Sequence, residues 1–362
     1  MSILTLCMNT RDLSKHTAYE AGRGVEEVAR ELNLDPNDLI KLSSNENAFG
    51  ASPRAVNAIQ EYAPTIHTYP KSTAYDLRKR LAKKWDVTLS QIWLANGGDG
   101  ALDYLARAFL EPNDSVLVSS PGFAYYGMSA RFHHGTVNQY PIRKQDDFRQ
   151  TAENVLDHYS GERIIYITSP HNPSGSEMPL EDVEIIATET SEQTLVVVDE
   201  AYQEFSNTKS ARSLVIERDD VAVLRTFSKA YGLAGLRLGY AIVPAAWSDA
   251  YAKVNTPFAA SEIACRAGLA AIDDTDHLEK TIQGVSSART YLYDELHTQT
   301  WESAGNFVLA EVSDGTSVAN KAQRAGVIVR DTTSFGLPEC IRITCGTNKQ
   351  MTNAVNVLND II

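Results

Sequence analysis

The chain has 362 residues, enough for two domains with a sizeable core, and its 43% share of apolar residues is ordinary for a soluble globular protein. Acidic side chains outnumber basic ones by 46 to 33, so the formal net charge of -13 argues against nucleic acid or an anionic membrane surface as a partner. The acidic excess also fits a salt-rich cytoplasm, in which case stability would increase steeply with KCl.

Four cysteines are scattered without the spacing of a metal site, so we expect no metal and reduced, mostly buried thiols at Cys7, Cys265, Cys340 and Cys345. The apolar patch at residues 3–8 has no basic flank, and no apolar run is long enough to span a membrane. The sequence therefore predicts a cytoplasmic protein without a membrane segment.

The first third of the chain mixes turns with two helices. Periodicity predicts one helix at about 24–32 and another at about 73–85. Between them, the asparagine-rich segment 42–50, which holds Asn45 and Asn47, is typical of a turn, and Tyr69 before Pro70 is extended.

Four apolar runs then end in polar turns, at 92–96, 115–119, 163–168 and 194–199, and we interpret each as a buried strand. The first strand leads through glycines into a helix, an arrangement that binds phosphate, so Gly98 and Asp99 are candidates, with Asp99 suited to cap the helix. Aromatic Phe123 follows the second strand, and Asn172 follows the third in a turn, where we interpret His171 as a loop histidine.

Asp199 ends the fourth strand, and a carboxylate there is costly to bury unless it is paired. It either caps a helix or pairs with a cationic ligand, and Tyr202 follows three residues later.

Lys229 lies in a polar turn between the predicted strands 221–224 and 239–243. A lysine desolvated between core strands has a lowered pKa and becomes a nucleophile toward carbonyl groups. Ser228, two glycines and Arg237 accompany it, and such groups suit a phosphate.

The remaining chain predicts a linker at 254–260, helices to about 297, and strands at 306–312, 326–330 and 340–344. Arg342 points to the face opposite its isoleucine neighbours. It is either solvated, as most strand arginines are, or a clamp for a carboxylate. Arg330 ends the preceding strand.

The motif Ser-Lys-x-x-Gly-x-x-Gly-x-Arg, from Ser228 to Arg237, resembles the cofactor segment of fold-type I pyridoxal-phosphate (PLP) enzymes, the aspartate aminotransferase superfamily. The resemblance implies that Lys229 carries PLP covalently. It implies the following further contacts: Gly98, Asp99, Ser228, Arg237 and the neighbouring subunit's Tyr69 on the phosphate, Phe123 on the ring face, Asn172 and Tyr202 on the phenolic oxygen, and Asp199 on the ring nitrogen.

The segment Asn45-Glu-Asn-Ala-Phe-Gly50 is similar to the substrate-side loop of the histidinol-phosphate aminotransferase branch, with Ala48 in place of the usual proline. The resemblance implies that Asn47 and Arg342 face a substrate carboxylate, that Arg330 binds the substrate's phosphate, and that Tyr19 belongs to an arm over the site. Gly100 replaces a usual glutamate, which leaves the backbone amides in place.

The resemblance runs from Tyr19 to Gly346 and implies an α/β fold, a large domain with a mainly parallel sheet plus a small α+β domain built from both termini. We expect residues 1–44 to form an arm and part of the small domain, 45–253 the PLP-binding domain, and 254–362 the rest of the small domain. The implied enzyme is a homodimer that converts L-histidinol phosphate and 2-oxoglutarate to imidazole acetol phosphate and glutamate in histidine biosynthesis.

Two rivals would keep the same cofactor residues, namely an aromatic aminotransferase and a threonine-phosphate decarboxylase of the same branch. A PLP-sensing transcription factor would need a basic DNA-binding module, which this acidic chain has no room for before Tyr19. A nicotinamide-dependent dehydrogenase would need a strand followed by Gly-x-Gly-x-x-Gly, which the sequence lacks.

Overall fold

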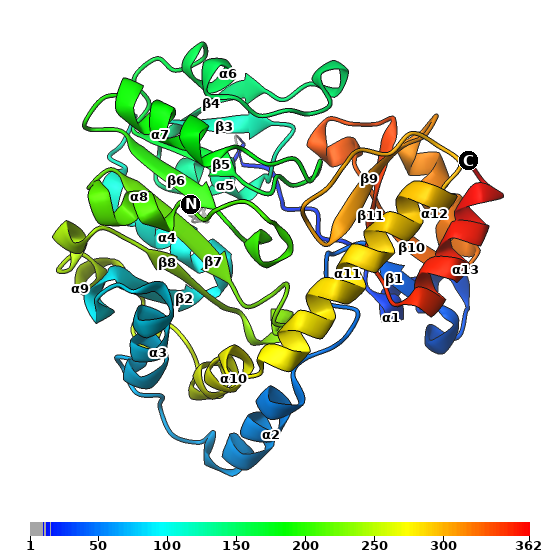
Figure 1. Ribbon diagram of the computed structural model, residues 1–362, viewed down its shortest axis with the longest axis horizontal. Helices are drawn as coiled ribbons and strands as arrows, with labels where there is room; N and C mark the ends of the chain where they lie inside the picture. Colours follow the sequence, from blue (N-terminus) through cyan, green and yellow to red (C-terminus); the bar gives the residue numbers. More distant parts are fainter. Residues whose placement is uncertain (1–9, 11, 15) are drawn as a thin grey trace, which may run out of the picture.

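The computed structural model describes residues 10, 12–14 and 16–362 (Figure 1). Its larger sheet has seven strands in the order β2-β8-β7-β6-β5-β3-β4. Their bounds are β2 Ile92–Asn96, β3 Ser115–Ser120, β4 Thr136–Pro141, β5 Ile164–Thr168, β6 Leu195–Asp199, β7 Val221–Thr226 and β8 Leu238–Ile242. Neighbouring strands are parallel except for the pairs that β8 makes with β2 and β7, so the predicted mainly parallel sheet is confirmed.

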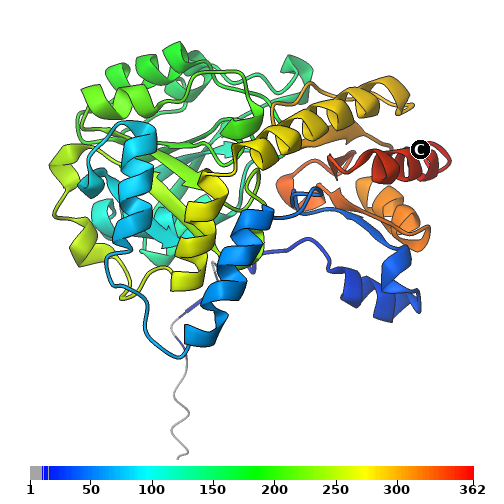
Figure 2. The same ribbon diagram turned by 60° about the horizontal axis from the view of Figure 1, so that its bottom comes forward.

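Helices cover both faces of this sheet because successive strand residues point to opposite sides (Figures 1 and 2). On one face, alternate residues such as Ile165 and Val196 join a core with α2, α3, α7, α8 and α10. On the other face, residues such as Ile164 and Val197 pack with α4, α5 and α9. The helices are α2 Pro53–Tyr62, α3 Tyr75–Trp85, α4 Gly97–Phe109, α5 Tyr125–Phe132, α6 Ala152–Leu156, α7 Leu180–Glu189, α8 Arg212–Glu217, α9 Tyr251–Val254 and α10 Glu262–Ile272.

The second sheet has four strands in the order β1-β10-β11-β9 and joins both ends of the chain. Strand β1 (Ile40–Leu42) pairs in parallel with β10 (Val327–Asp331), and β11 (Cys340–Thr344) pairs antiparallel with β10 and with β9 (Phe307–Glu311). The accompanying helices are α1 Val25–Leu32, α11 Thr275–Glu295, α12 Gly315–Arg324 and α13 Asn348–Asn359.

Two details differ from the sequence-based expectation. Strand β4 was not predicted, because its polar and exposed residues give no apolar run at the edge of the sheet. The glycines after β2 form no separate turn, since α4 begins at Gly97, and Asp99 therefore lies inside its first turn rather than at the cap.

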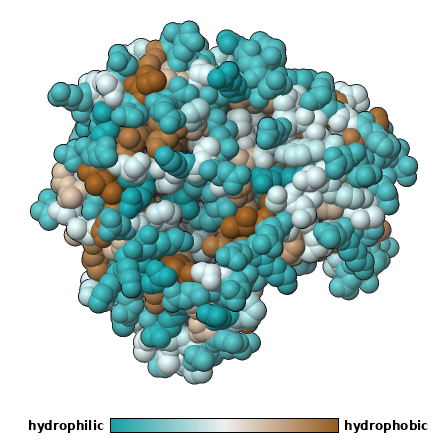
Figure 3. Space-filling model, in the orientation of Figure 1, coloured by the Kyte–Doolittle hydropathy of each residue, from teal (hydrophilic) through white to brown (hydrophobic). Residues whose placement is uncertain are grey.

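The described helices include none that is long and apolar enough to cross a membrane. Cys265, Cys340 and Cys345 are free and buried, as expected, whereas Cys7 and the apolar patch at 3–8 lie outside the described residues. In the view of Figure 3 the surface is mostly hydrophilic, with apolar residues in small groups.

Candidate active site

A cavity of about 600 Å³ lies at the carboxyl ends of the parallel strands β5, β6 and β7, the edge where α/β sheets bind ligands. It brings together residues that are up to 323 positions apart in sequence, from Tyr19 to Arg342. Of the residues predicted from sequence, it is lined by Tyr19, Gly98, Asp99, Phe123, Asn172, Asp199, Tyr202, Ser228, Lys229, Arg237, Arg330 and Arg342.

Asp199 is a buried carboxylate at the end of β6, with an exposed fraction of 5%. Burial raises the pKa of Asp199 to about 6, although hydrogen bonds from Tyr126 Oη (2.7 Å) and the Ala201 amide (2.9 Å) act in the opposite direction. No salt bridge within the described part of the chain involves Asp199. A protonated ring nitrogen is therefore a chemically suitable partner for this carboxylate.

Lys229 follows β7 and faces the same cavity. Burial, and secondly the charge of Arg342, lower the pKa of Lys229 to about 8. The Nζ atom donates a hydrogen bond to the Ser44 carbonyl (3.2 Å) and lies 5.6 Å from the centre of the Tyr202 ring. A substantial share of this amine is thus neutral near pH 8 and able to attack a carbonyl group.

The amino terminus of α4 lines the cavity, and no side chain in the described part of the chain caps it. Arg237 crosses this end and pairs with Asp99 over 2.7 Å. Gly97 has a φ of +78°, which favours glycine, and a Cβ atom there would lie 2.6 Å from Arg237 Nη2, so the guanidinium would have to shift. Ser228 lies nearby in the lining, and the helix terminus, hydroxyl and guanidinium together suit a phosphate group.

Two arginines of the smaller sheet also line the cavity. Arg330 on β10 and Arg342 on β11 are directly opposite each other in the strand register. Arg342 is 5% exposed, and it donates hydrogen bonds to Asn172 Oδ1 and to the Ser43 carbonyl (2.9 Å), while its buried Nε has no partner among residues 10, 12–14 and 16–362. Of the two interpretations left open for Arg342, the solvated one is therefore wrong.

Two predicted site residues do not line this cavity. The Asn47 side-chain oxygen instead accepts from the Phe49 amide within its own turn (2.9 Å), and its side-chain nitrogen donates to the distant Ala230 carbonyl (3.0 Å). Tyr69 is 83% exposed and stacks on Phe258 with ring centroids 4.8 Å apart. The roles predicted for these residues stay predictions.

The cavity also contains residues that sequence reasoning missed. Tyr126 lies on α5, three residues after Phe123, and its ring packs edge-on against that ring at 5.5 Å. Phe123 precedes the first residue of α5, so this contact depends on the turn before the helix, and no helical periodicity in the sequence signalled it. Asn45, rather than Asn47, reaches the cavity and donates to Tyr202 Oη over 3.1 Å.

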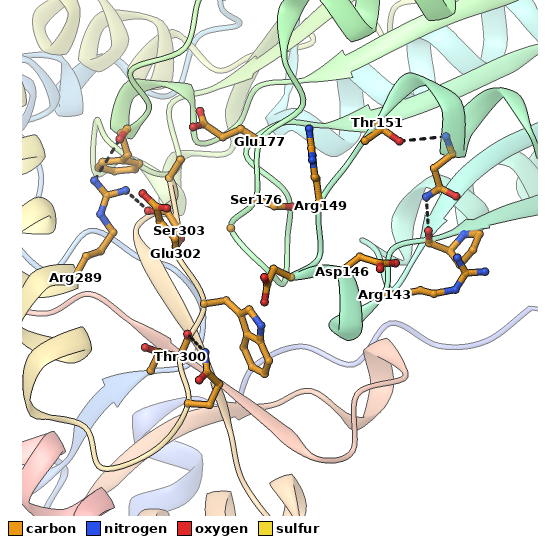
Figure 4. Close-up of a pocket in the computed structure, with 18 of the residues that line it drawn as sticks. Arg143, Asp146, Arg149, Thr151, Ser176, Glu177, Arg289, Thr300, Glu302 and Ser303 are labelled. Carbon is orange, nitrogen blue, oxygen red and sulfur yellow. Dashed lines mark hydrogen bonds between the residues drawn. The ribbon is translucent and has the colours of Figure 1, made fainter.

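A second and larger cavity, of about 1090 Å³, holds none of the residues predicted for the site. Figure 4 shows Arg143, Asp146 and Arg149 on one side of it and Arg289, Glu302 and Ser303 on the other. We place the chemistry in the smaller cavity, because the buried lysine and carboxylate with shifted pKa values lie there.

The fold is α/β with a mainly parallel sheet, and one cavity holds a desolvated lysine, a buried carboxylate and a helix terminus suited to phosphate. These features define the class of fold-type I PLP-dependent transferases. The chain belongs to the family "aminotransferase class I and II", whose model matches residues 37–358.

Proteins of similar sequence have a more specific name than the family. A histidinol-phosphate aminotransferase of Natronomonas pharaonis is 66% identical over 98% of this chain and 100% of its own length. One from Haloarcula marismortui is 63% identical over 98% of this chain and 99% of its own length.

The fold is shared with solved structures. The histidinol-phosphate aminotransferase of Sinorhizobium meliloti in complex with pyridoxal-5'-phosphate has a TM-score of 0.89 and 26% identity, covering 99% of this chain and 98% of its own. The aspartate aminotransferase of Thermus thermophilus with maleate has a TM-score of 0.86 at 23% identity, covering 98% of this chain and 100% of its own, and shows the fold alone.

Proposed function

We propose that the protein is a PLP-dependent aminotransferase that moves the amino group of L-histidinol phosphate to 2-oxoglutarate, giving imidazole acetol phosphate and glutamate in histidine biosynthesis. The observation that carries this proposal is the pair Arg330 and Arg342, opposite each other in the wall that faces Lys229. The names of relatives with 57–66% identity support it.

The arginine pair argues for a substrate with a strongly negative end. Like charges directly opposite on neighbouring strands repel each other and destabilise a sheet. A phosphate monoester carries about 1.5 to 2 negative charges near pH 7 and offers three acceptor oxygens. Such a group suits Arg330 and relieves the repulsion, while the buried Arg342 beside it suits a carboxylate of 2-oxoglutarate or glutamate.

The cofactor residues divide by the part of PLP that they would hold. Asp199 would pair with the ring nitrogen, and Asn172 and Tyr202 with the phenolic oxygen. The start of α4, Ser228 and Arg237 would hold the phosphate, with Arg237 released from Asp99. When bound, PLP supplies an electron sink for the charge left by loss of a proton from the substrate.

Lys229 is the group that moves that proton. Its Nζ, as a neutral amine, takes the proton from the carbon that bears the substrate's amino group and later returns one. Tyr202 and Asp199, which line the cavity together with Lys229, are each 5% exposed. Tyr202 and Asn172 keep the reacting groups oriented.

The assembly we propose is a homodimer in which Tyr69 completes the neighbouring subunit's site. Its high exposure and its absence from the cavity lining of its own chain support this. The proposed division is an arm with part of the small domain at 1–44, a PLP-binding domain at 45–253 and the rest of the small domain at 254–362, in a cytoplasmic enzyme.

The deciding experiment is a single half-reaction. Purified protein loaded with PLP is mixed with histidinol phosphate without an oxo acid, and the visible band of the lysine-bound cofactor is followed. We expect the band to convert to that of the pyridoxamine form, and Lys229→Ala to lack the band. A band that phenylalanine or tyrosine converts faster would favour an aromatic aminotransferase. Carbon dioxide released from threonine phosphate would favour the decarboxylase.

A further inference from the structure

His171 is a fully buried imidazole between two loops of the cavity. One loop follows β3 and contains Pro121, and the other follows β5 and contains Asn172. The Nε2 atom lies 3.1 Å from the Pro121 carbonyl oxygen and 3.2 Å from Ser119 Oγ. On the other side of the ring, Nδ1 lies 2.7 Å from Ser174 Oγ. The imidazole therefore contacts both loops at once.

These contacts select one form of the ring. The Pro121 carbonyl is an acceptor, so Nε2 must carry the hydrogen. Burial lowers the pKa of His171 to about 4, so the ring is neutral and Nδ1 accepts from the Ser174 hydroxyl. Ser174 Oγ accepts from the Ser176 amide over 3.3 Å and lies 3.0 Å from Ser176 Oγ, whose hydroxyl can donate to it, so the Ser174 proton goes to Nδ1.

Both loops are closely packed where His171 meets them. A Cβ atom on Gly122 would lie 2.5 Å from the Ser119 carbonyl oxygen. Gly175 has a φ of +86°, and a Cβ atom there would lie 2.8 Å from the Cα of Ser303. The His171 amide also donates to the Ser176 carbonyl over 2.7 Å. A change at His171 thus meets backbone that has little room to compensate.

We propose that His171 is a positioning residue, whose single neutral tautomer ties the Pro121 loop to the Asn172 turn. Phe123 lies two residues beyond Pro121, and Asn172 is the next residue after His171. The imidazole thereby fixes the position of Phe123, which would stack on the PLP ring, relative to Asn172, which would contact the phenolic oxygen of PLP. The inference rests on the PLP-binding part of the proposed function and is independent of the substrate.

The first test measures PLP affinity. His171→Phe keeps a ring of similar size but removes both nitrogens, whereas His171→Gln keeps an amide that can donate to the Pro121 carbonyl. Because a lost buried hydrogen bond leaves its partner unsatisfied, we expect the PLP dissociation constant of the apoenzyme to rise about tenfold or more in His171→Phe and clearly less in His171→Gln. Thr194→Val is the control, since Thr194 is also buried and hydrogen-bonded but directly precedes β6, at the end of that strand away from Asp199. It should leave PLP affinity unchanged.

The second test reads the tautomer directly. In protein labelled with ¹⁵N-histidine, the resonances that disappear in His171→Gln should show a protonated Nε2 and an unprotonated Nδ1. A proton on Nδ1, or an unchanged PLP dissociation constant in His171→Phe, would overturn the proposal. If His171→Phe does not fold, His171→Gln must still weaken PLP binding and the tautomer must still hold.

The two proposals can be separated. Failure of histidinol phosphate as a substrate, with both His171 results as expected, overturns the substrate assignment alone. A parent protein that binds no PLP overturns both.

Discussion

Tyr126 donates a hydrogen bond of 2.7 Å to Asp199, the buried carboxylate at the end of β6. The ring of Tyr126 stacks on Tyr166 at 4.8 Å and meets Phe123 edge-on, so the hydroxyl has a fixed position. Asp199 accepts this bond as an anion, and the bond opposes the effect of burial on its pKa. Tyr126 therefore helps to keep Asp199 charged for a cationic ring nitrogen.

Replacing Tyr126 by phenylalanine should weaken both PLP binding and turnover. A hydrogen bond to a charged group contributes about 1.5–3 kcal/mol, so we expect a loss of about 10- to 100-fold in PLP affinity, measured by titration of the apoenzyme. Tyr166→Phe is the matched control, because the buried Tyr166 hydroxyl has no partner among the described residues. Equal losses in both variants would contradict the role of the Tyr126 hydroxyl.

The attachment of PLP to the apoenzyme should depend on pH through Lys229. The pKa of Lys229 is lowered to about 8, so its amine is protonated below that pH and neutral above it. Only the neutral amine attacks the aldehyde, so the rate should rise about tenfold per pH unit below pH 8 and level off above it. Stopped-flow absorbance measures this rate. Pyridoxine phosphate, which has no aldehyde, should bind without this pH-dependent attachment. A rate of PLP attachment that does not change with pH would contradict the assignment of Lys229 as the attacking amine.

Arg330→Ala should impair the use of a phosphorylated substrate. Loss of one guanidinium contact to a phosphate should raise the KM for histidinol phosphate by about 10- to 100-fold. The KM for histidinol, which has no phosphate, should change far less. Arg324→Ala, which removes an exposed arginine of α12 outside the cavity, is the control for loss of charge. A proportional change for both substrates would show that Arg330 does not bind the phosphate.

Variants of Tyr69 test whether this residue completes the active site of the neighbouring subunit. Tyr69→Ala and Lys229→Ala homodimers should both be nearly inactive, because each site lacks one required group. Co-expressed, they should recover up to about a quarter of parental activity, since half of the dimers are mixed and each mixed dimer has one intact site. No recovery in chromatographically verified mixed dimers would place Tyr69 outside the neighbouring site.

The net charge of -13 predicts a dependence of stability on salt. Repulsion among exposed acidic groups opposes the folded state, and salt screens it within about 10 Å at 0.1 M. The midpoint of urea unfolding should therefore increase as KCl rises toward molar concentrations, measured by tryptophan fluorescence. An uncharged osmolyte of equal osmolarity serves as the control, and a midpoint independent of KCl would exclude adaptation to a salt-rich cytoplasm.

The sequence by itself determined where most of the strands lie along the chain and which residue types follow them. Apolar runs located β5, β6 and β7, and the carboxyl ends of parallel strands meet at one edge, so Asn172, Asp199 and Lys229 could be expected in one place. The spacing of Ser228, Lys229 and Arg237 carried the family resemblance, because close contact with a phosphate tolerates few residue types.

Only the tertiary structure decided contacts between distant segments. It placed Asn45 in the cavity instead of Asn47, because the Asn47 side chain bonds the Phe49 amide in its own turn and the distant Ala230 carbonyl. It also buried Arg342 against Asn172, 170 positions away, and it joined His171 to the Pro121 loop. Local periodicity reports which face of an element is apolar, whereas these pairings depend on how separate elements pack, which no short stretch of sequence records.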